Sequence, residues 1–436
     1  MDFINRESEL RLLEETWEQS QKSARMTVLV GRRRIGKTSL AIKACENKVF
    51  LYFFVARKNE ALLCQDFLEE IGIKLNLPAL GGYTSFTRLF ELLLVTSGSR
   101  PFTLIIDEFQ EFLHINPSVF SDMQNLWDRH KNTAKLNLII SGSIYSLMKK
   151  IFENAGEPLF GRANEKIYLK PFNTDVLKDV VTSINPRIRP EDLLAFYTIT
   201  GGVAKYVEHF ADKQKTTRKQ LLSEIFRENS LLLDEGMNLL IEEFGRDHTT
   251  YFSILSLIAS ARTSRSEIES ILEKNTGGYL DRLENDYQII KKVRPVLAKP
   301  GSKSQKYFID DNFLGFWFRF IYKNRAALEI GNYAYALSVA ERDFESFSGP
   351  YLEKYFREKL ARTGDYSLVG RYWEKGNQNE IDIVAVNERN KTLLIAEVKL
   401  NKEKINPLAL RNKASTLLRD FAGFKVSFAA FSLEDM

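Results

Sequence analysis

A phosphate-binding motif near the amino end limits the possible folds more than any other part of the sequence. Residues 26–38 read MTVLVGRRRIGKT, a short β-branched apolar run followed by the spacing GxxxxGK[ST]. The helical sequence SLAIKACEN comes next, so the motif stands between a strand and a helix, as a phosphate loop requires. The glycines let backbone N–H groups surround a phosphate, and the positive end of the helix dipole faces it. The sequence therefore predicts an α/β fold with a parallel sheet and a nucleotide at this loop.

Each position of the loop has an expected role toward bound ATP. Lys37 would reach the β and γ phosphates, and the hydroxyl of Thr38 would be a ligand of Mg²⁺. The alternative is a glycine turn that matches the motif by chance. The residues expected to bind the nucleotide are Gly31, Arg32, Arg33, Arg34, Ile35, Gly36, Lys37, Thr38 and Ser39.

A second strand-like run, TLIIDEFQ at residues 103–110, ends in two carboxylates. Magnesium bound to a nucleotide needs an anionic partner, and hydrolysis needs a group that orients water. We expect Asp107 to hold the hydrated Mg²⁺ and Glu108 to polarise the attacking water. Alone, an apolar strand followed by Asp-Glu is a common strand end; together with the loop it indicates ATP hydrolysis.

Two further segments could place polar side chains beside the γ phosphate. The run LNLIISGS ends in hydroxyls, so Ser141 or Ser143 would sense the phosphate, unless the serines only close a strand and cap the next helix. Arg162, in PLFGRANEKIYL, would stabilise transition-state charge in its own site or in that of a neighbouring subunit. The second case requires a homo-oligomer, and the alternative is a surface salt bridge.

The segments FINRESEL, VGRRRIGKTSL, LIIDEFQE, LIISGS and PLFGRA together resemble the archaeal-type ATPase family within the AAA+ and STAND group of P-loop ATPases. The resemblance implies a P-loop NTPase core over residues 1–169, with residues 3–7 near the adenine, and a helical lid over residues 170–246. The lid of such relatives often carries GGxPxYL. The matching stretch here, GGVAKYV, has Ala204 in place of the proline.

The sequence of residues 247–330 predicts three short helices, two strands joined by PGSKS, and a buried aromatic helix. The first five elements are typical of a winged helix, in which the third helix enters a DNA groove and the wing contacts phosphates. The net charge of the chain is only +5, but a surplus of five basic residues lies between Arg282 and Lys306. We therefore expect DNA contacts, or else a protein-docking role, from Lys291, Lys292, Arg294, Lys299, Lys303 and Lys306.

Residues 335–436 predict an amphipathic helix and then the strands YSLVGRYW, NEIDIVAV and TLLIAEVKL. Glu397 and Lys399 share one face of the third strand, because alternate residues of a strand point the same way. A hairpin can bring Asp382 of the second strand to them. The two carboxylates would bind Mg²⁺, and the lysine would activate water or stabilise the charge that develops in phosphodiester hydrolysis.

This arrangement resembles the PD-(D/E)XK nuclease core, which implies a restriction-endonuclease-like α/β domain in which Glu353 of the helix completes the metal site. The alternative is a solvent-facing hairpin with an ordinary Glu-Lys alternation, because a fold does not guarantee its chemistry.

The whole pattern predicts a DNA-associated ATPase with a nuclease-like tail. A signalling or assembly switch, whose tail is an interaction module, is the alternative. The longest apolar runs fall far short of the ~20 residues that cross a bilayer. The polar N-terminus does not resemble a secretory signal, so we expect a cytoplasmic protein. The four histidines and two cysteines are scattered, which does not favour a zinc site.

Overall fold

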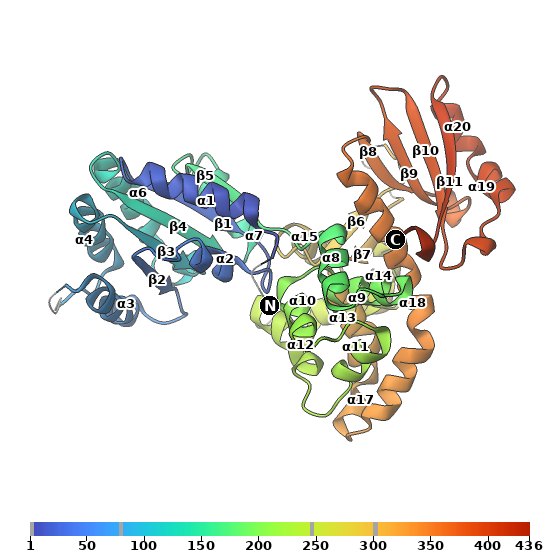
Figure 1. The fold of residues 1–436 in the computed structure, drawn as a ribbon, viewed down its shortest axis with the longest axis horizontal. Helices are drawn as coiled ribbons and strands as arrows, with labels where there is room; N and C mark the ends of the chain where they lie inside the picture. The colour runs from blue at the N-terminus through green and yellow to red at the C-terminus, as the bar shows by residue number, and fades with distance from the viewer. Residues whose placement is uncertain (1–3, 78–81, 245–247, 300–303) are drawn as a thin grey trace. The chain divides into compact units, whose positions relative to one another are not determined.

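The computed structural model describes residues 4–77, 82–244, 248–299 and 304–436. The chain forms two compact units (Figure 1). The amino-terminal unit holds residues 2–171 and the short segment 285–287. The carboxy-terminal unit holds the remainder of the described chain from residue 172 onward. Each unit has its own sheet and its own buried core.

The amino-terminal unit is built on a five-stranded parallel sheet in the order β2-β3-β4-β1-β5. Its strands are β1 (Arg25–Val30), β2 (Phe50–Phe54), β3 (Phe102–Asp107), β4 (Leu136–Gly142) and β5 (Glu165–Tyr168). Its helices are α1 (Glu7–Ser20), α2 (Lys37–Lys43), α3 (Glu60–Leu75), α4 (Phe86–Ser99), α5 (Phe112–Ile115), α6 (Ser118–His130) and α7 (Tyr145–Glu153). The predicted parallel sheet is confirmed.

Helices cover both faces of this sheet, which explains why its central strands are continuous apolar runs. On one face, Leu13 of α1 and Leu40 of α2 pack against the sheet; on the other, a larger core includes residues of α3, α4, α6 and α7. Val30 pairs with Gly142, and Ile106 pairs with Ile140. The carboxyl ends of β1, β3 and β4 therefore lie at one edge, where the residues that follow them meet.

The carboxy-terminal unit begins with a helical region, in agreement with the expected helices after the core. Its helices are α8 (Thr174–Ile184), α9 (Pro190–Thr200), α10 (Ala204–Asp212), α11 (Arg218–Ile225) and α12 (Leu231–Phe244). The predicted three helices and hairpin follow as α13 (His248–Ala259), α14 (Arg265–Leu272), α15 (Gly277–Asn285), β6 (Ile290–Val293) and β7 (Lys306–Ile309). We call the described parts of residues 290–309 the wing hairpin.

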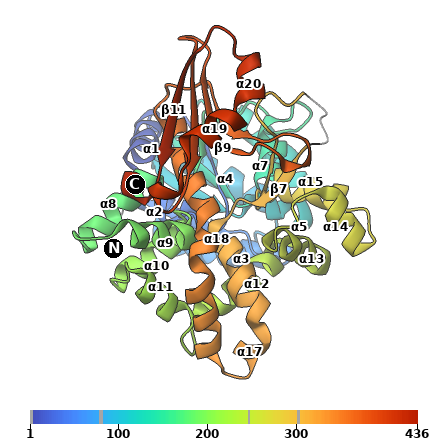
Figure 2. The same ribbon diagram turned by 90° about the vertical axis from the view of Figure 1, so that its right-hand side faces the viewer.

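The aromatic segment after the hairpin is buried, as predicted. It forms α16 (Asn312–Phe316), which continues as a π-helical stretch (Trp317–Ile321), and Trp317 is 2% exposed. The indole N–H of Trp317 donates to the carbonyl of Leu233 at 2.7 Å. A Cβ atom at Gly236 would lie 2.3 Å from the Trp317 ring, so α12 needs a glycine there. After α17 (Arg325–Glu329), the long helix α18 (Tyr333–Arg362) leads to the last sheet (Figure 2).

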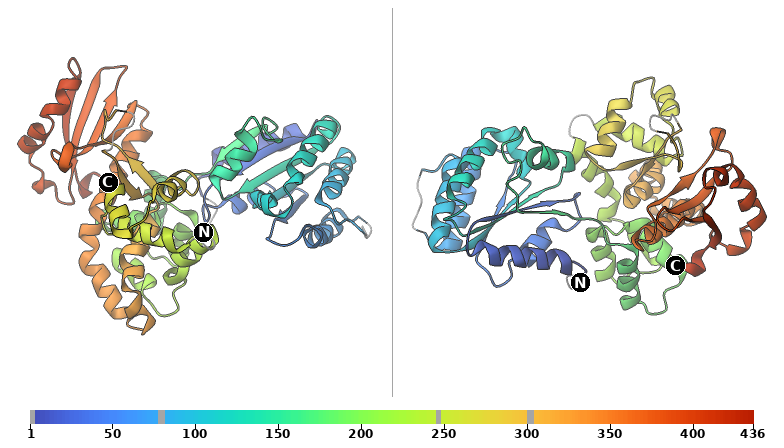
Figure 3. Two further views of the ribbon diagram at one scale, coloured as in Figure 1. Left: turned by 180° about the vertical axis from the view of Figure 1, so that it is seen from behind. Right: turned by 90° about the horizontal axis from the view of Figure 1, so that it is seen from above.

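That last sheet has four strands in the order β11-β10-β9-β8. Its elements are β8 (Leu368–Tyr372), β9 (Ile381–Asn387), β10 (Thr392–Val398), α19 (Pro407–Lys413), α20 (Ser415–Asp420) and β11 (Lys425–Phe431). The strands β8, β9 and β10 are antiparallel, and β11 runs parallel to β10 after the connection through α19 and α20 (Figure 3). The three strands predicted for this region are present. Across both units, none of the described helices combines the length and apolar character needed to span a membrane.

Candidate functional site

The phosphate loop (residues 31–38) connects β1 to α2 and depends on both of its glycines. Gly36 has a φ of 94°, in the left-handed region that residues with a side chain rarely adopt. A Cβ atom at Gly31 would lie 2.9 Å from the carbonyl oxygen of Leu169. The loop can therefore adopt this conformation only because both positions lack a side chain.

The two polar residues at the end of the loop, Lys37 and Thr38, are buried and half-buried, respectively. Lys37 is 7% exposed, and its ammonium group donates to the carbonyls of Gly31 at 2.7 Å and Arg32 at 3.1 Å. The hydroxyl of Thr38 donates to Oδ2 of Asp107 at 2.6 Å. A hydroxyl and a carboxylate thus converge beside the loop, and this donor set suits Mg²⁺.

Asp107 accepts hydrogen bonds from three hydroxyl groups at the end of β3. Besides Thr38, the donors are Tyr52 at 2.9 Å and Ser141, and the backbone N–H of Glu108 donates at 3.0 Å. Burial would raise the pKa of Asp107, but these hydroxyls and the charge of Lys37 outweigh it and hold the pKa below its usual value. The carboxylate is therefore charged at neutral pH.

Glu108 has an unusual backbone conformation and two side-chain donors. Its φ of 55° lies in the left-handed region, which is uncommon for a residue with a Cβ atom. Its carboxylate accepts a hydrogen bond from Ser143 at 2.7 Å and another from Gln110. The two serines considered as phosphate sensors thus have different partners, because Ser141 contacts Asp107 and Ser143 contacts Glu108.

Sequence reasoning missed Tyr52 and Gln110. Tyr52 stands in the apolar run FLYFF, where an aromatic residue is an ordinary strand residue. Only the strand order, which places β2 next to β3, brings its hydroxyl to Asp107. Gln110 follows the Asp-Glu pair by two positions, but the turn that carries it back to Glu108 is not evident from the sequence.

Arg162 is not brought to the phosphate loop of its own chain. It precedes β5, and the nearby N–H of Asn164 donates to the carbonyl of Met26 at 2.8 Å, at the start of β1. The loop follows the other end of β1. The guanidinium of Arg162 pairs with Asp128 at 2.9 Å and donates to the carbonyl of Phe160 at 2.8 Å. The expected role in its own site is therefore corrected to a surface salt bridge.

In the carboxy-terminal unit, the hairpin of β9 and β10 brings Asp382, Glu397 and Lys399 together, as predicted. The ammonium group of Lys399 lies 3.5 Å from Asp382 Oδ2 and 3.2 Å from Glu397 Oε1. The N–H of Val398 donates to Asp382 at 2.8 Å, and Lys413 of α19 lies 3.1 Å from Glu397. We call Asp382, Glu397 and Lys399 the hairpin cluster.

Charges within the hairpin cluster favour a protonated lysine. Burial would lower the pKa of Lys399, but the negative charges of Asp382 and Glu397 outweigh it and raise the pKa above its usual value. An ammonium group that keeps its proton can stabilise negative charge but cannot accept a proton. Of the two roles considered for Lys399, this supports charge stabilisation.

Glu353 does not join the hairpin cluster as a third free carboxylate, contrary to the expected metal site. It forms ion pairs with Arg371 and with Arg357, the latter at 3.3 Å. Burial raises the pKa of Glu353 despite these arginines. Within the described ranges, no three Asp, Glu, His or Cys side chains gather closely enough to hold a metal ion. Two guanidinium groups occupy the carboxylate that the resemblance assigned to Mg²⁺.

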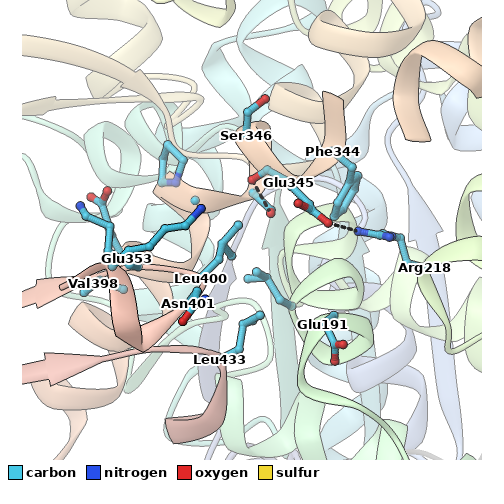
Figure 4. Close-up of a pocket in the computed structure, with 16 residues that line it drawn as sticks. Glu191, Arg218, Phe344, Glu345, Ser346, Glu353, Val398, Leu400, Asn401 and Leu433 are labelled. Carbon is cyan, nitrogen blue, oxygen red and sulfur yellow. Dashed lines mark hydrogen bonds and ion pairs between the residues drawn. The ribbon is translucent and has the colours of Figure 1, made fainter. Parts of the chain in front are cut away.

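A groove of about 490 Å³ lies beside the hairpin cluster (Figure 4). Glu353 of α18 and Lys399 line one part of it. Arg218 of α11 lines another part, where it lies 3.6 Å from Glu345. The groove thus connects part of the candidate site to a surface that carries both signs of charge.

The basic residues of the wing hairpin are only partly available to DNA. Lys292 pairs with Glu284 at 2.8 Å, and Lys306 lies 3.7 Å from Glu380. Among the described members of the predicted set, the exposed ones are Lys291, Arg294 and Lys299. Lys303 of the wing and Phe3 of the expected adenine contact lie outside the described residues. The predicted patch of six cations is therefore smaller than the sequence suggested.

Comparison with known proteins follows the division of the chain. Residues 3–210 match an ATPase domain found predominantly in Archaea, and residues 317–412 match a family of archaeal and bacterial proteins of unknown function. An uncharacterized protein of Methanocaldococcus jannaschii is 30% identical over 407 residues, which cover 91% of this chain and 87% of that protein. The chain belongs to this archaeal-type ATPase family.

Two other proteins are similar to parts of this archaeal-type ATPase. An uncharacterized ATP-binding protein of the same archaeon is 48% identical over 46 residues, 11% of this chain and 75% of that protein. The structure of a Walker-type ATPase of Pyrococcus abyssi has a TM-score of 0.54 and 20% identity, over 73% of this chain and 96% of that one. The latter shows a shared fold. The family implies nucleotide binding by the amino-terminal unit.

Proposed function

We propose that this archaeal-type ATPase binds ATP with Mg²⁺ at the phosphate loop and hydrolyses it. The observation that carries the proposal is the 2.6 Å hydrogen bond between Thr38 and Asp107. It places a hydroxyl and a charged carboxylate where a metal ion on the β and γ phosphates would need them. The buried ammonium group of Lys37 stands at the same loop and supplies the positive charge that the phosphates require.

The proposed reaction requires two groups to change partners. Mg²⁺, when bound with ATP, neutralises charge on the phosphates. Lys37 leaves the carbonyls of Gly31 and Arg32 to contact phosphate oxygens. Glu108 leaves Ser143 and Gln110 and accepts a proton from a water molecule. The oxygen of that water bonds to the γ phosphorus, while the bond between the γ phosphorus and ADP breaks. Until then, the two donors occupy the carboxylate of Glu108.

ATP turnover and nucleotide affinity test this proposal in parallel. For Glu108→Gln, we expect turnover to fall at least ~100-fold with little change in affinity, because general-base catalysis contributes factors of this size. For Lys37→Ala, affinity itself should fall. Unchanged affinity in Lys37→Ala, measured with a fluorescent ATP analogue and Mg²⁺, would show that ATP does not bind at the loop.

We also propose that the carboxy-terminal region acts on DNA. The proposed divisions are a core (1–169), a lid (170–246), a winged helix with its connecting helix (247–330) and a nuclease-like domain (335–436). Asp382 and Glu397 would hold Mg²⁺, and the protonated Lys399 would stabilise charge on the phosphate as water attacks it. The 3.5 Å and 3.2 Å distances within the hairpin cluster support this proposal. The exposed Lys291, Arg294 and Lys299 would contact the DNA backbone.

A second candidate function is a nucleotide-controlled switch whose carboxy-terminal domain is an interaction module. The ion pairs of Glu353 with two arginines favour it, because they leave only two carboxylates for a metal ion. Magnesium-dependent nicking of DNA that is lost in Asp382→Ala would support the nuclease. Nucleotide-dependent oligomerisation, with no change of DNA mobility in gels, would support the switch.

A further inference from the structure

The wing hairpin is docked on the edge strand of the last sheet. The N–H of Val296 donates to the carbonyl of Arg371 in β8 at 2.8 Å, beside a parallel bridge between Pro295 and Arg371. Val296 is 6% exposed and belongs to the same buried core as Tyr372. An isolated bridge thus joins the segment after β6 to β8, and Val296 contributes an apolar side chain to the core of the last sheet.

Polar and aromatic contacts extend this docking along the hairpin. Lys306 of β7 lies 4.7 Å from the ring centre of Trp373, and the indole N–H of Trp373 donates to Ser304 at 3.0 Å. Trp373 is only 4% exposed. The wing therefore covers the end of β8, and Lys306 serves this contact.

Gly370 of β8 shows how close the two elements are. A Cβ atom at this position would lie 2.8 Å from a methyl group of Val296, closer than carbon atoms pack without displacement. Valine is stiff about its single side-chain torsion, so the methyl group could not turn away freely. A side chain at residue 370 would press the wing hairpin off the sheet.

Arg371 connects this interface to Glu353. Its backbone holds the wing, its guanidinium lies 5.2 Å from the ring centre of Phe308 in β7, and the same guanidinium pairs with Glu353. Its Nε is buried without a hydrogen-bond partner in the described part of the chain. This arginine is therefore held in an incompletely satisfied position by contacts on two sides.

Glu353 and Lys399 line the same groove, and Arg357 connects Glu353 to the backbone of the hairpin cluster. Burial is the main cause of the raised pKa of Glu353, and the charge of Asp382 adds to it. Glu353 in turn is one of the carboxylates that raise the pKa of Lys399. Arg357, the second partner of Glu353, donates to the backbone carbonyl of Asp382 at 3.0 Å. A change at Arg371 would thus alter the electrostatic environment of the hairpin cluster.

We infer that the docked wing hairpin, acting through Arg371 as a positioning residue, keeps Glu353 from serving the hairpin cluster as a metal ligand. A partner that draws the wing off β8 releases Arg371 and removes one of the two guanidinium groups that pair with Glu353, so that Glu353 can exchange Arg357 for a metal ion. The partner that fits is DNA, because the exposed wing residues Lys291, Arg294 and Lys299 are cations and the phosphate backbone attracts them. The inference rests on the proposed metal binding by Asp382 and Glu397.

Two variants that loosen the wing from opposite sides test the inference in the full chain. They are Gly370→Ala, which adds the clashing methyl group, and Val296→Ser, which removes the apolar contact. Gly278→Ala is the matched control, because Gly278 is exposed and a Cβ atom there meets nothing within 4 Å. Arg371→Gln removes the charge directly, and Arg371→Lys restores it in part.

Hydrogen exchange of the segments that contain Glu353 and Asp382, and the affinity for Mn²⁺ alone, are the two measurements. We expect both loosened variants and Arg371→Gln to exchange faster there. We also expect them to bind Mn²⁺ about tenfold more tightly, because Glu353 loses an ion pair that competes with the metal ion; groups around metal ligands act on affinity on a scale of ~10- to 100-fold. Arg371→Lys should gain less affinity for Mn²⁺ than Arg371→Gln, and Gly278→Ala should not change the affinity. Double-stranded DNA added to the parent should reproduce the faster exchange.

The outcomes separate the inference from the proposed function. If exchange increases only in the wing and β8, or if Arg371→Gln gains no affinity while Asp382→Ala abolishes binding, the coupling through Arg371 is refuted. If exchange increases around Glu353 but no protein binds Mn²⁺ in a way that depends on Asp382, the coupling stands and the metal site fails.

Discussion

Substitution of Ser141 by alanine should expose how strongly the phosphate-loop site depends on the charge of Asp107. Ser141 is fully buried and its hydroxyl donates to Asp107. A hydrogen bond to a charged group contributes about 1.5–3 kcal/mol, and no solvent reaches this side chain to weaken it. We therefore expect Ser141→Ala to lower the free energy of unfolding of the amino-terminal unit by about 2 kcal/mol at pH 7.

The pH dependence follows from the lowered pKa of Asp107. A carboxyl whose pKa is lower in the folded state stabilises that state fully above its unfolded value of about 3.9, and this contribution is lost as the pH falls through the folded pKa. The penalty of Ser141→Ala should thus be equal at pH 7 and pH 5 and should shrink below about pH 4.

Ser97→Ala is the matched control. Ser97 is equally buried in the same unit, but it donates to the carbonyl of Leu94 at 2.7 Å and accepts from the N–H of Lys135 at 3.2 Å, both uncharged groups. Loss of the Ser97 hydroxyl should lower the free energy of unfolding by about 1 kcal/mol at every pH. Hydrogen exchange of the amides in β3 and β4 reports the penalties. Equal penalties for both serines, or a penalty of Ser141→Ala that stays unchanged down to the lowest pH at which the unit remains folded, would refute the role assigned to the charge.

Three other predictions concern glycines and Arg162. Gly36→Ala should weaken binding of a fluorescent ATP analogue, because a Cβ atom in the left-handed region costs about 1–2 kcal/mol and Gly36 has a φ of 94°. Gly202→Ala should lower the thermal midpoint of the carboxy-terminal unit, since its Cβ atom would lie 2.1 Å from the carbonyl oxygen of Phe172; an unchanged midpoint contradicts the fold there. Arg162→Ala should leave ATP affinity unchanged, and turnover should fall only at protein concentrations that favour oligomers. A loss of turnover in dilute protein would place Arg162 in its own site.

The predicted site residues that the structure brings together are those with local signals in the sequence. The loop motif fixes the neighbourhood of Thr38 because strand, turn and helix are adjacent in sequence. The position of Asp107 was predictable because it ends a short apolar strand. Tyr52 depends on strand order, which no local pattern encodes. The prediction for Arg162 was wrong for its own chain because β5 lies parallel to β1, so the residues that precede it lie at the edge away from the loop.

Long-range ion pairs in the carboxy-terminal unit were equally difficult to predict from the sequence. The hairpin of β9 and β10 brought Asp382 to Lys399 because strand alternation and a short turn determine that geometry. The partners of Glu353 and Lys306 depend instead on how separate elements pack. Arg371 comes from an edge strand, and Glu380 lies 74 positions after Lys306 in the sequence. Counting cations along the chain therefore overestimated how many of them the wing leaves exposed.

The docking of the wing on β8 limits how the protein can be divided for experiments. An unpaired edge strand offers its N–H and C=O groups to other chains and promotes aggregation. A fragment that begins at residue 335 would lose Val296 from its core and uncover both Gly370 and Trp373. We expect such a fragment to self-associate, whereas one that keeps the carboxy-terminal unit from residue 172 onward should stay monodisperse. The predicted boundary at residue 335 would thus separate Val296 from the core into which it packs.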